Sequence, residues 1–254
     1  MTQIDLNSDL GESFGPWTMG DDAAMLSVVS SANVACGGHA SDPETMFATL
    51  STAHSKGVII GAHPGYTDRI GFGRRVIPMT AAEIERMTAA QIGALIGVAG
   101  LAGARVRYVK AHGALANLAA DDRTVADALA RAVKAVAPDL AYLAISGTHQ
   151  EAAAKAAGLQ TYSEIFADRG YQPNGRLVPR SHPGAMIHDP ALATDRLLRF
   201  LDTGLMPVVG GDPIRLCAQS ICVHSDSPGS VAMARHIAKT FATAGIAIKP
   251  FLAP

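Results

Sequence analysis

Short apolar runs alternate with longer segments of helical character along the whole chain, and most of the runs end in a polar residue. The runs that predict strands are 4–6, 32–35, 58–61, 106–109, 141–145, 160–165 and 220–223. Between them lie helix-start signals such as Asp42-Pro43, Asp189-Pro190 and a capping box formed by Thr80 with Glu83. This alternation predicts a mostly parallel sheet covered by helices.

Other helix boundaries are less sharply marked. Asp22 is a plausible N-cap for a helix over 23–29, and Asp121 or Asp122 for one that ends before Pro138. Ser227-Pro228 predicts the start of a final helix that stops at Gly245. Residues 174–180 predict a turn followed by an extended arm, and 207–209 form only a short apolar run.

A barrel and an open doubly wound sheet both satisfy the alternation. Polar residues follow many different strands, and only a closed parallel barrel brings all of its carboxyl-end loops to one centre. We therefore expect an α/β fold with a single domain over 1–254. Its expected architecture is a distorted TIM-like (β/α) barrel of seven or eight parallel strands.

Composition and charge limit the kinds of molecule that the protein is expected to bind. The 254 residues are 48% hydrophobic and carry a net charge of −1 with scattered Lys and Arg, which disfavours nucleic acid and anionic membranes as partners. The sequence shows neither a signal segment nor a run of about twenty apolar residues, so a cytoplasmic protein is expected. The sequence leaves open whether the protein forms a homo-oligomer.

The three cysteines fit a reducing compartment. They are Cys36, Cys217 and Cys222, an odd number without C-x-x-C spacing, which argues against a thiolate zinc site. Cys217 and Cys222 are expected to be small core residues. Cys36 precedes two glycines and His39, so it is either a packed thiol or, if its thiolate is stabilised, a nucleophile.

Two carboxylates follow the first strand. Gly11 lets the chain turn sharply, so Asp9 and Glu12 should project where the strand ends. We interpret the pair as part of a site on which several polar groups converge. The alternative for Asp9 is a turn or helix-capping role.

Histidines recur in an equivalent position. His39, His63, His112 and His224 each follow a predicted strand within a few residues, whereas His54 and His236 lie in helical segments and are expected to be surface or packing residues. Imidazoles gathered at one site could relay protons or ligate a metal. If a divalent metal is bound, the expected ligands are Asp9, His39 and His63.

Cationic side chains complete the candidate site. Lys110 stands two residues before His112 and suits an anionic substrate or a developing oxyanion, although it could instead pair with Asp9 or Glu12 for structure. Arginines of the later loops could grip a substrate carboxylate through paired hydrogen bonds, or could simply hold their loops down. The expected substrate-binding residues are Asp168, Arg169, Arg180, His224 and Asp226, and Arg74 with Arg75 is a further candidate.

Several common catalytic motifs are missing from the sequence. It has no G-x-x-x-x-G-K-[ST] loop, no G-x-G-x-x-G after the first strand, no G-x-S-x-G elbow and no H-E-x-x-H helix. A self-contained P-loop nucleotidase or a serine hydrolase is therefore disfavoured.

Taken together, the motifs resemble the LamB/YcsF family, and the likeness runs in order along nearly the whole chain. The matching stretches are 5–7, 9–15, 19–22, 31–33, 35–37, His39, 61–66, 71–75, 109–110, 112–115, 166–169, 177–180, 188–190, 222–224, Asp226 and 228–229. The chain departs from the expected family pattern at Gly38, Ser41, Ala111, Ala116 and Ser225. None of these departures removes an ionisable group, but they bear on the shape of the pocket.

The resemblance implies a barrel of the glycoside hydrolase/deacetylase type. It also implies ATP-dependent opening of 5-oxo-L-proline to L-glutamate, performed with 5-oxoprolinase subunits B and C. ATP would be a cosubstrate of the complex, bound at residues that the sequence does not identify.

The candidate residues fit that chemistry. Asp9 or Glu12, with a histidine from His39, His63 or His112, would activate water. Lys110 would stabilise negative charge on the activated oxygen, and Arg169 or Arg180 would hold the substrate carboxylate. Two other functions stay open: a metal-dependent carbohydrate deacetylase and a non-catalytic metabolite-binding subunit.

Overall fold

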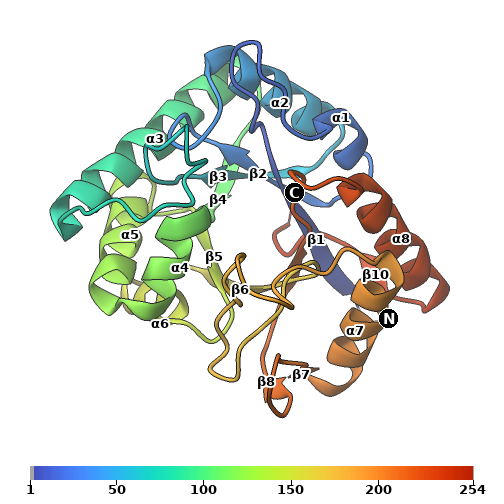
Figure 1. Cartoon of the computed structure of the whole chain (residues 1–254). Helices are drawn as coiled ribbons and strands as arrows, with labels where there is room; N and C mark the ends of the chain where they lie inside the picture. Colours follow the sequence, from blue (N-terminus) through green and yellow to red (C-terminus); the bar gives the residue numbers. More distant parts are fainter. Residues whose placement is uncertain (1–2, 254) are drawn as a thin grey trace.

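The computed structural model describes residues 3–253, and these form a closed barrel of seven parallel strands with one further parallel strand (Figure 1). In barrel order the strands are β1 (Gln3–Leu10), β2 (Ser31–Ala35), β3 (Ile59–His63), β4 (Val106–Val109), β5 (Ala141–Ile145), β6 (Thr161–Phe166) and β9 (Ser220–Cys222). β9 pairs with both β6 and β1 and so closes the ring, while β10 (Ala247–Ile248) pairs with the start of β1. The predicted barrel is confirmed.

Helices surround the strands on the outside (Figure 1). They are α1 (Asp22–Met25), α2 (Pro43–Ser55), α3 (Ala81–Leu101), α4 (Gly113–Asp121), α5 (Arg123–Val136), α6 (His149–Ala156), α7 (Pro190–Thr203) and α8 (Ser230–Thr243). The predicted caps are confirmed for α2, α3, α5 and α7, where Asp42, Thr80, Asp122 and Asp189 accept hydrogen bonds from first-turn amides.

Two predicted caps are wrong. Asp21, not Asp22, caps α1, because the Asp22 carboxylate instead accepts hydrogen bonds from the Gly11 amide and the Thr49 hydroxyl. α8 begins after Gly229, whose left-handed φ of 82° ends the preceding turn, and no side chain caps it. The sequence pattern also missed α4, the β7 (Leu205–Met206) to β8 (Ile214–Arg215) hairpin, and β10.

The barrel holds both apolar and polar side chains. Ile59, Tyr108, Leu143 and Leu252 belong to one buried apolar cluster. Gly61 makes room for it, because a Cβ there would lie 2.3 Å from the Tyr108 ring. Asp9 and Lys110 are buried at the carboxyl ends of the strands, where they line the cavity described below.

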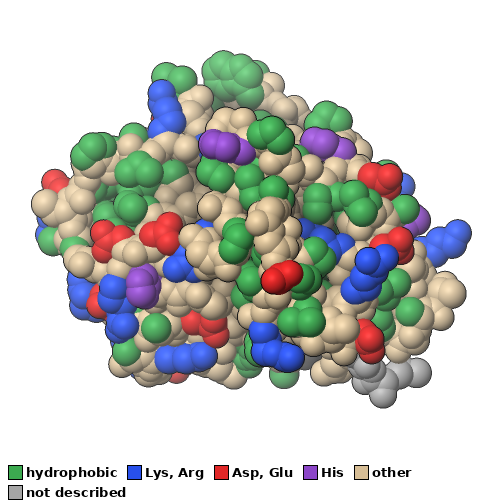
Figure 2. All heavy atoms as spheres, turned by 60° about the horizontal axis from the view of Figure 1, so that its bottom comes forward, with side chains coloured by type: hydrophobic (Ala, Val, Ile, Leu, Met, Phe, Trp, Pro, Cys, Tyr) green, Lys and Arg blue, Asp and Glu red, His purple; other side chains and the backbone are tan. Residues whose placement is uncertain are grey.

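The face shown in Figure 2 mixes basic and acidic side chains without a broad area of one sign. Within residues 3–253, no helix is both long and apolar enough to cross a lipid bilayer.

Candidate active site

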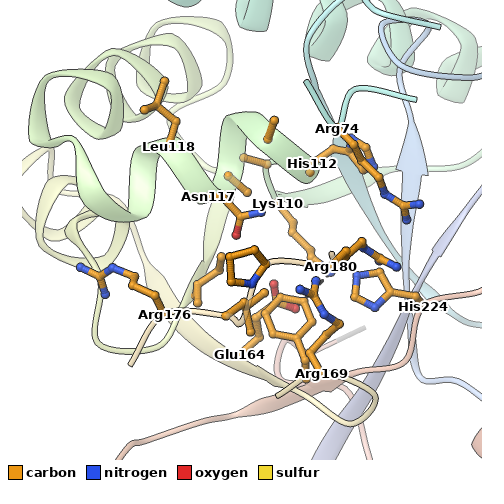
Figure 3. Close-up of a pocket in the computed structure, with 18 of the residues that line it drawn as sticks. Arg74, Lys110, His112, Asn117, Leu118, Glu164, Arg169, Arg176, Arg180 and His224 are labelled. Carbon is orange, nitrogen blue, oxygen red and sulfur yellow. Dashed lines mark ion pairs between the residues drawn. The ribbon is translucent and has the colours of Figure 1, made fainter. Parts of the chain in front are cut away.

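A cavity of about 610 Å³ opens at the carboxyl ends of the strands (Figure 3). Its walls come from strand ends, from α4 and from the arm that follows β6. The ionisable groups predicted from the sequence that line it are Asp9, His63, Arg74, Lys110, His112, Arg169, Arg180 and His224. Segments far apart in the sequence therefore converge on one space, as the barrel topology requires.

Lys110 and Asp9 form the centre of a buried ionic network. The Lys110 Nζ lies 2.9 Å from Oδ1 of Asp9, 3.1 Å from Oε2 of Glu164 and 3.1 Å from Sγ of Cys222. The same Asp9 oxygen accepts a 2.8 Å hydrogen bond from Nδ2 of Asn33. The structure thus pairs Lys110 with Asp9 and Glu164, not with Glu12.

The network fixes the charges of its members. Burial alone would raise the pKa of Asp9, but its neighbours His63 and Lys110 hold that pKa well below its usual 3.8. Burial would lower the pKa of Lys110, but the neighbouring carboxylates raise it well above its usual value. Burial raises the pKa of Glu164 to about 7, with Lys110 acting in the opposite direction. Lys110 and Asp9 are therefore a charged pair, while Glu164 titrates near neutrality.

Beside Asp9 lies a second group of four buried side chains, which we call the imidazole cluster: Glu12, His39, His63 and His112. The rings of His39 and His112 stack 3.6 Å apart, and Nε2 of His39 lies 3.2 Å from Oε1 of Glu12. Burial lowers the pKa of His39 to about 3 and that of His112 well below its usual range, and it raises the pKa of Glu12 to about 8. Both stacked imidazoles are accordingly neutral.

His63 joins the imidazole cluster to Asp9. Its Nδ1 lies 2.7 Å from the Lys110 carbonyl oxygen, which can only accept a hydrogen bond, so Nδ1 carries the proton of the neutral ring. Its Nε2 then presents a lone pair 3.4 Å from Oδ1 of Asp9. His63 also lines the cavity, so this nitrogen can take a proton there.

His224 is oriented by a carboxylate that comes from another strand end. Its Nδ1 lies 2.9 Å from Oδ2 of Asp168, and its Nε2 lies 3.8 Å from Oδ2 of Asp9. Burial would lower the pKa of His224, but Asp168 more than offsets this and raises it. Asp226, although near His224 in the sequence, binds Arg74 at 2.6 Å.

Two guanidiniums face the cavity without a carboxylate partner within ion-pair distance in the described part of the chain (Figure 3). Arg169 donates to the carbonyl oxygens of Ala185 and Val178, which fix its position. Arg180 donates a hydrogen bond to Sδ of Met186. Burial lowers the pKa of both guanidiniums; the charge of Arg180 adds to this for Arg169, whose pKa falls to about 10, and the charge of Arg74 adds to it for Arg180. An anion bound here would therefore relieve an unfavourable concentration of positive charge.

Some predicted site residues lie behind the cavity wall. Glu12 and His39 reach the cavity only through His63 and His112, and Asp168 reaches it through His224. Asp226 lies outside the lining as the partner of Arg74. Arg75 binds Asp68 and also points elsewhere.

Sequence reasoning missed Glu164, Asn7, Asn33 and Cys222, which surround Lys110 and Asp9 from inside the barrel. The sequence did contain a signal for Glu164, because this charged residue lies inside the run that predicts β6.

The cysteines also differ from expectation in part. Cys36 is buried, its sulfur accepts a hydrogen bond from the His63 amide, and burial raises the pKa of the thiol to about 12. Cys36 is therefore a packed thiol and not a nucleophile. Cys217 is exposed and not a core residue, whereas Cys222 is buried.

The imidazole cluster offers one carboxylate and three imidazole donors within 4.8 Å of one another, which are ligand types that divalent transition metals accept. The expected set of Asp9, His39 and His63 is therefore not the one that the structure assembles. Glu12 takes the place of Asp9, whose Oδ1 is already engaged by Lys110 and Asn33.

Known proteins resemble this chain over its full length. A protein of Rhodopseudomonas palustris named as the A subunit of 5-oxoprolinase is 49% identical over 252 residues, covering 99% of both chains. One of Azorhizobium caulinodans with the same name is 50% identical over 251 residues, again covering 99% of both.

Solved structures agree with the fold. The crystal structure of a lactam utilization protein from Thermus thermophilus matches 98% of this chain and 100% of its own, with a TM-score of 0.92 and 38% identity. A deacetylase named T48 matches with a TM-score of 0.50 at 15% identity, which shows likeness of fold alone. The family model described as LamB/YcsF matches residues 4–254. This chain belongs to the LamB/YcsF family.

Proposed function

We propose that this chain is the A subunit of an ATP-dependent 5-oxoprolinase and that it performs the ring-opening step of 5-oxo-L-proline hydrolysis. Its full-length similarity to proteins of that name supports the activity. The observation that carries the proposal is the cavity, where proton acceptors, an ammonium and two carboxylate-free guanidiniums face one space. A small anionic amide needs such a combination.

The chemistry explains why ATP is required. A five-membered lactam has a poorly electrophilic carbonyl carbon, and phosphorylation of its oxygen would activate that carbon. Addition of water and cleavage of the C–N bond would then release the α-amine and leave an acyl phosphate, which a second water hydrolyses to glutamate and phosphate. Because the sequence has no phosphate-binding loop, we assign phosphorylation to partner subunits B and C.

The geometry supports a role for each group. Lys110 would stabilise negative charge on the activated oxygen, and Arg169 with Arg180 would hold the substrate carboxylate. His63 and His224 are the proton acceptors that reach the cavity, each oriented through its other ring nitrogen. Asp9 stabilises the charge of Lys110 and faces both imidazoles.

The test is glutamate formation from 5-oxo-L-proline and ATP, with this chain and subunits B and C present together and singly. We expect product only from the full set, and Asp9→Asn should abolish it while the fold persists. ATP hydrolysis dependent on 5-oxoproline by this chain alone would contradict the division of labour.

The same preparation distinguishes the other two functions. Acetate release from an N-acetylated oligosaccharide without any lactam opening would indicate a deacetylase. Binding of 5-oxoproline with no turnover in the full set would indicate a metabolite-binding subunit. We place the reaction in the cytoplasm, since the three cysteines are free thiols.

A further inference from the structure

We propose that the imidazole cluster binds one divalent transition-metal ion through Glu12 and the three histidines. The four side chains come from four separate strand ends and are all buried. Three nitrogens and one carboxylate oxygen form a donor set suited to Zn²⁺, Co²⁺ or Fe²⁺. The proposal does not depend on which reaction the cavity performs.

An unsatisfied nitrogen is the first support. Among the described residues, Nε2 of His63 is buried and has no hydrogen-bond partner. Buried polar atoms are nearly always satisfied, so this nitrogen needs an explanation, and a bound cation supplies one. Nε2 of His39 and Nε2 of His112, which approach Glu12, would be the other two nitrogen ligands.

The carboxylate is the second support. In the described part of the chain, Glu12 has no lysine or arginine within 4.0 Å, and its ion-pair neighbours are His39 at 3.2 Å and His112 at 3.9 Å. Within residues 3–253, no internal cation therefore occupies the Glu12 carboxyl group, and its oxygens are available to an ion that the imidazoles hold.

The orientation of His63 is the third support. Its Nδ1 donates to the Lys110 carbonyl oxygen at 2.7 Å, which leaves Nε2 as the ring nitrogen that can bind an ion. Metal-binding histidines commonly have this arrangement, in which an outer acceptor fixes the tautomer and directs the other nitrogen at the ion.

A second group of potential metal ligands is already occupied by a cation of the chain itself. Asp9, Cys222 and His224 also bring ligand atoms within 4.8 Å of one another. There the ammonium of Lys110 already lies 2.9 Å from Asp9 and 3.1 Å from Cys222, so the chain provides its own cation. The imidazole cluster has the donors without such an internal cation.

Binding requires one local change. His39 and His112 stack with an interplanar angle of 5°, and two imidazoles that share an ion must direct nitrogens at a common point. One ring therefore tilts on binding. Gly65 and Gly73 pack against these rings, and a Cβ at either position would lie within 3.0 Å of them.

The test is a Co²⁺ titration of the chelator-treated full chain, followed by visible ligand-field absorption and by the metal content after dialysis. We expect one ion per chain. Glu12→Gln and His112→Ala should each weaken binding by at least about tenfold, the lower end of the cost of losing an outer-shell partner. His54→Ala and His236→Ala, at exposed positions on α2 and α8, are the matched controls and should bind normally.

A further variant separates the two ligand sets. Asp9→Asn should retain the Co²⁺ spectrum if Glu12 is the carboxylate ligand. Loss of binding in Asp9→Asn but not in Glu12→Gln, equal loss in the His54 and His236 controls, or no stoichiometric binding at all would overturn the proposal. If His112→Ala fails to fold, the nearly isosteric Glu12→Gln decides the outcome.

Discussion

The ammonium of Lys110 lies 2.9 Å from the carboxylate of Asp9, and both side chains are buried at the carboxyl-end rim of the barrel. Asp9 lies in β1 and Lys110 directly follows β4, so the two residues are 101 positions apart in the sequence. The pair is at once the electrostatic centre of the interior and part of the cavity wall. Its loss should therefore affect stability and activity together.

Lys110→Met should lower the free energy of unfolding by about 3–5 kcal/mol, because it leaves Asp9 and Glu164 buried without their cation. Urea denaturation measures this change. Arg131→Met breaks an exposed pair with Glu85 and should cost no more than about 1 kcal/mol. Equal effects of the two substitutions would contradict the central role of the Lys110 network.

Asp168→Asn should move the acidic limb of the kcat/KM profile to lower pH. Burial lowers the pKa of His224 and the Asp168 carboxylate raises it, so removing that charge lowers the pKa, by about 1–3 pH units for an adjacent carboxylate. His224 must be deprotonated to accept a proton, so the acidic limb of the kcat/KM profile follows the pKa of His224. Asp226→Asn, which removes the partner of Arg74, should leave the limb in place.

Arg180→Lys should raise KM for 5-oxo-L-proline about tenfold, as expected for the loss of a bidentate contact worth roughly 1.4 kcal/mol, while kcat changes little. Steady-state kinetics with 2-pyrrolidinone, a lactam without a carboxylate, provide the comparison. The preference of the wild-type chain for 5-oxoproline over 2-pyrrolidinone should shrink in the variant. An unchanged preference would place the carboxylate elsewhere.

Asp5→Asn should reduce the loss of stability between about pH 4 and pH 6. Burial raises the pKa of Asp5 to about 6, although hydroxyl hydrogen bonds from Ser220, Ser30 and Ser31 lower it in part. A carboxyl group whose pKa is higher in the folded than in the unfolded state contributes to stability. This contribution is complete at pH values below the unfolded-state pKa. That contribution, about 3 kcal/mol, is lost as pH rises through 6.

Urea unfolding at several pH values checks this prediction. The wild-type free energy of unfolding should decline across that window, and the variant should decline less. Asp202→Asn on α7, an exposed position, should leave the decline unchanged. Parallel curves for wild type and Asp5→Asn would exclude Asp5 as the titrating group.

The sequence predicted those parts of the fold that depend on local signals. Strand runs, the Thr80/Glu83 capping box and the polar residues at strand ends are each written within a few positions, and Asp9, His63 and Lys110 do meet at one rim. α4 was missed because no capping side chain marks its start after His112.

Side-chain contacts between distant strands of the barrel could not be predicted from such local signals. Asp168 reaches His224, 56 residues away, because β9 pairs directly with β6 and skips α7 and the hairpin between them. Asp226 is much nearer to His224 in the sequence, yet it binds Arg74. Glu164 faces Lys110 because of strand register, which an apolar run does not specify.

The way the ring closes affects how the protein is made. β1 pairs with β9, and the hydrogen bond from Asn7 to Ser220 spans 213 residues. A ribosome that has released β1 must synthesise most of the remaining chain before that strand finds its second neighbour. Until then the nascent sheet has an open edge, so chaperone protection during translation should matter more for this protein than its finished, edgeless interior would lead one to expect.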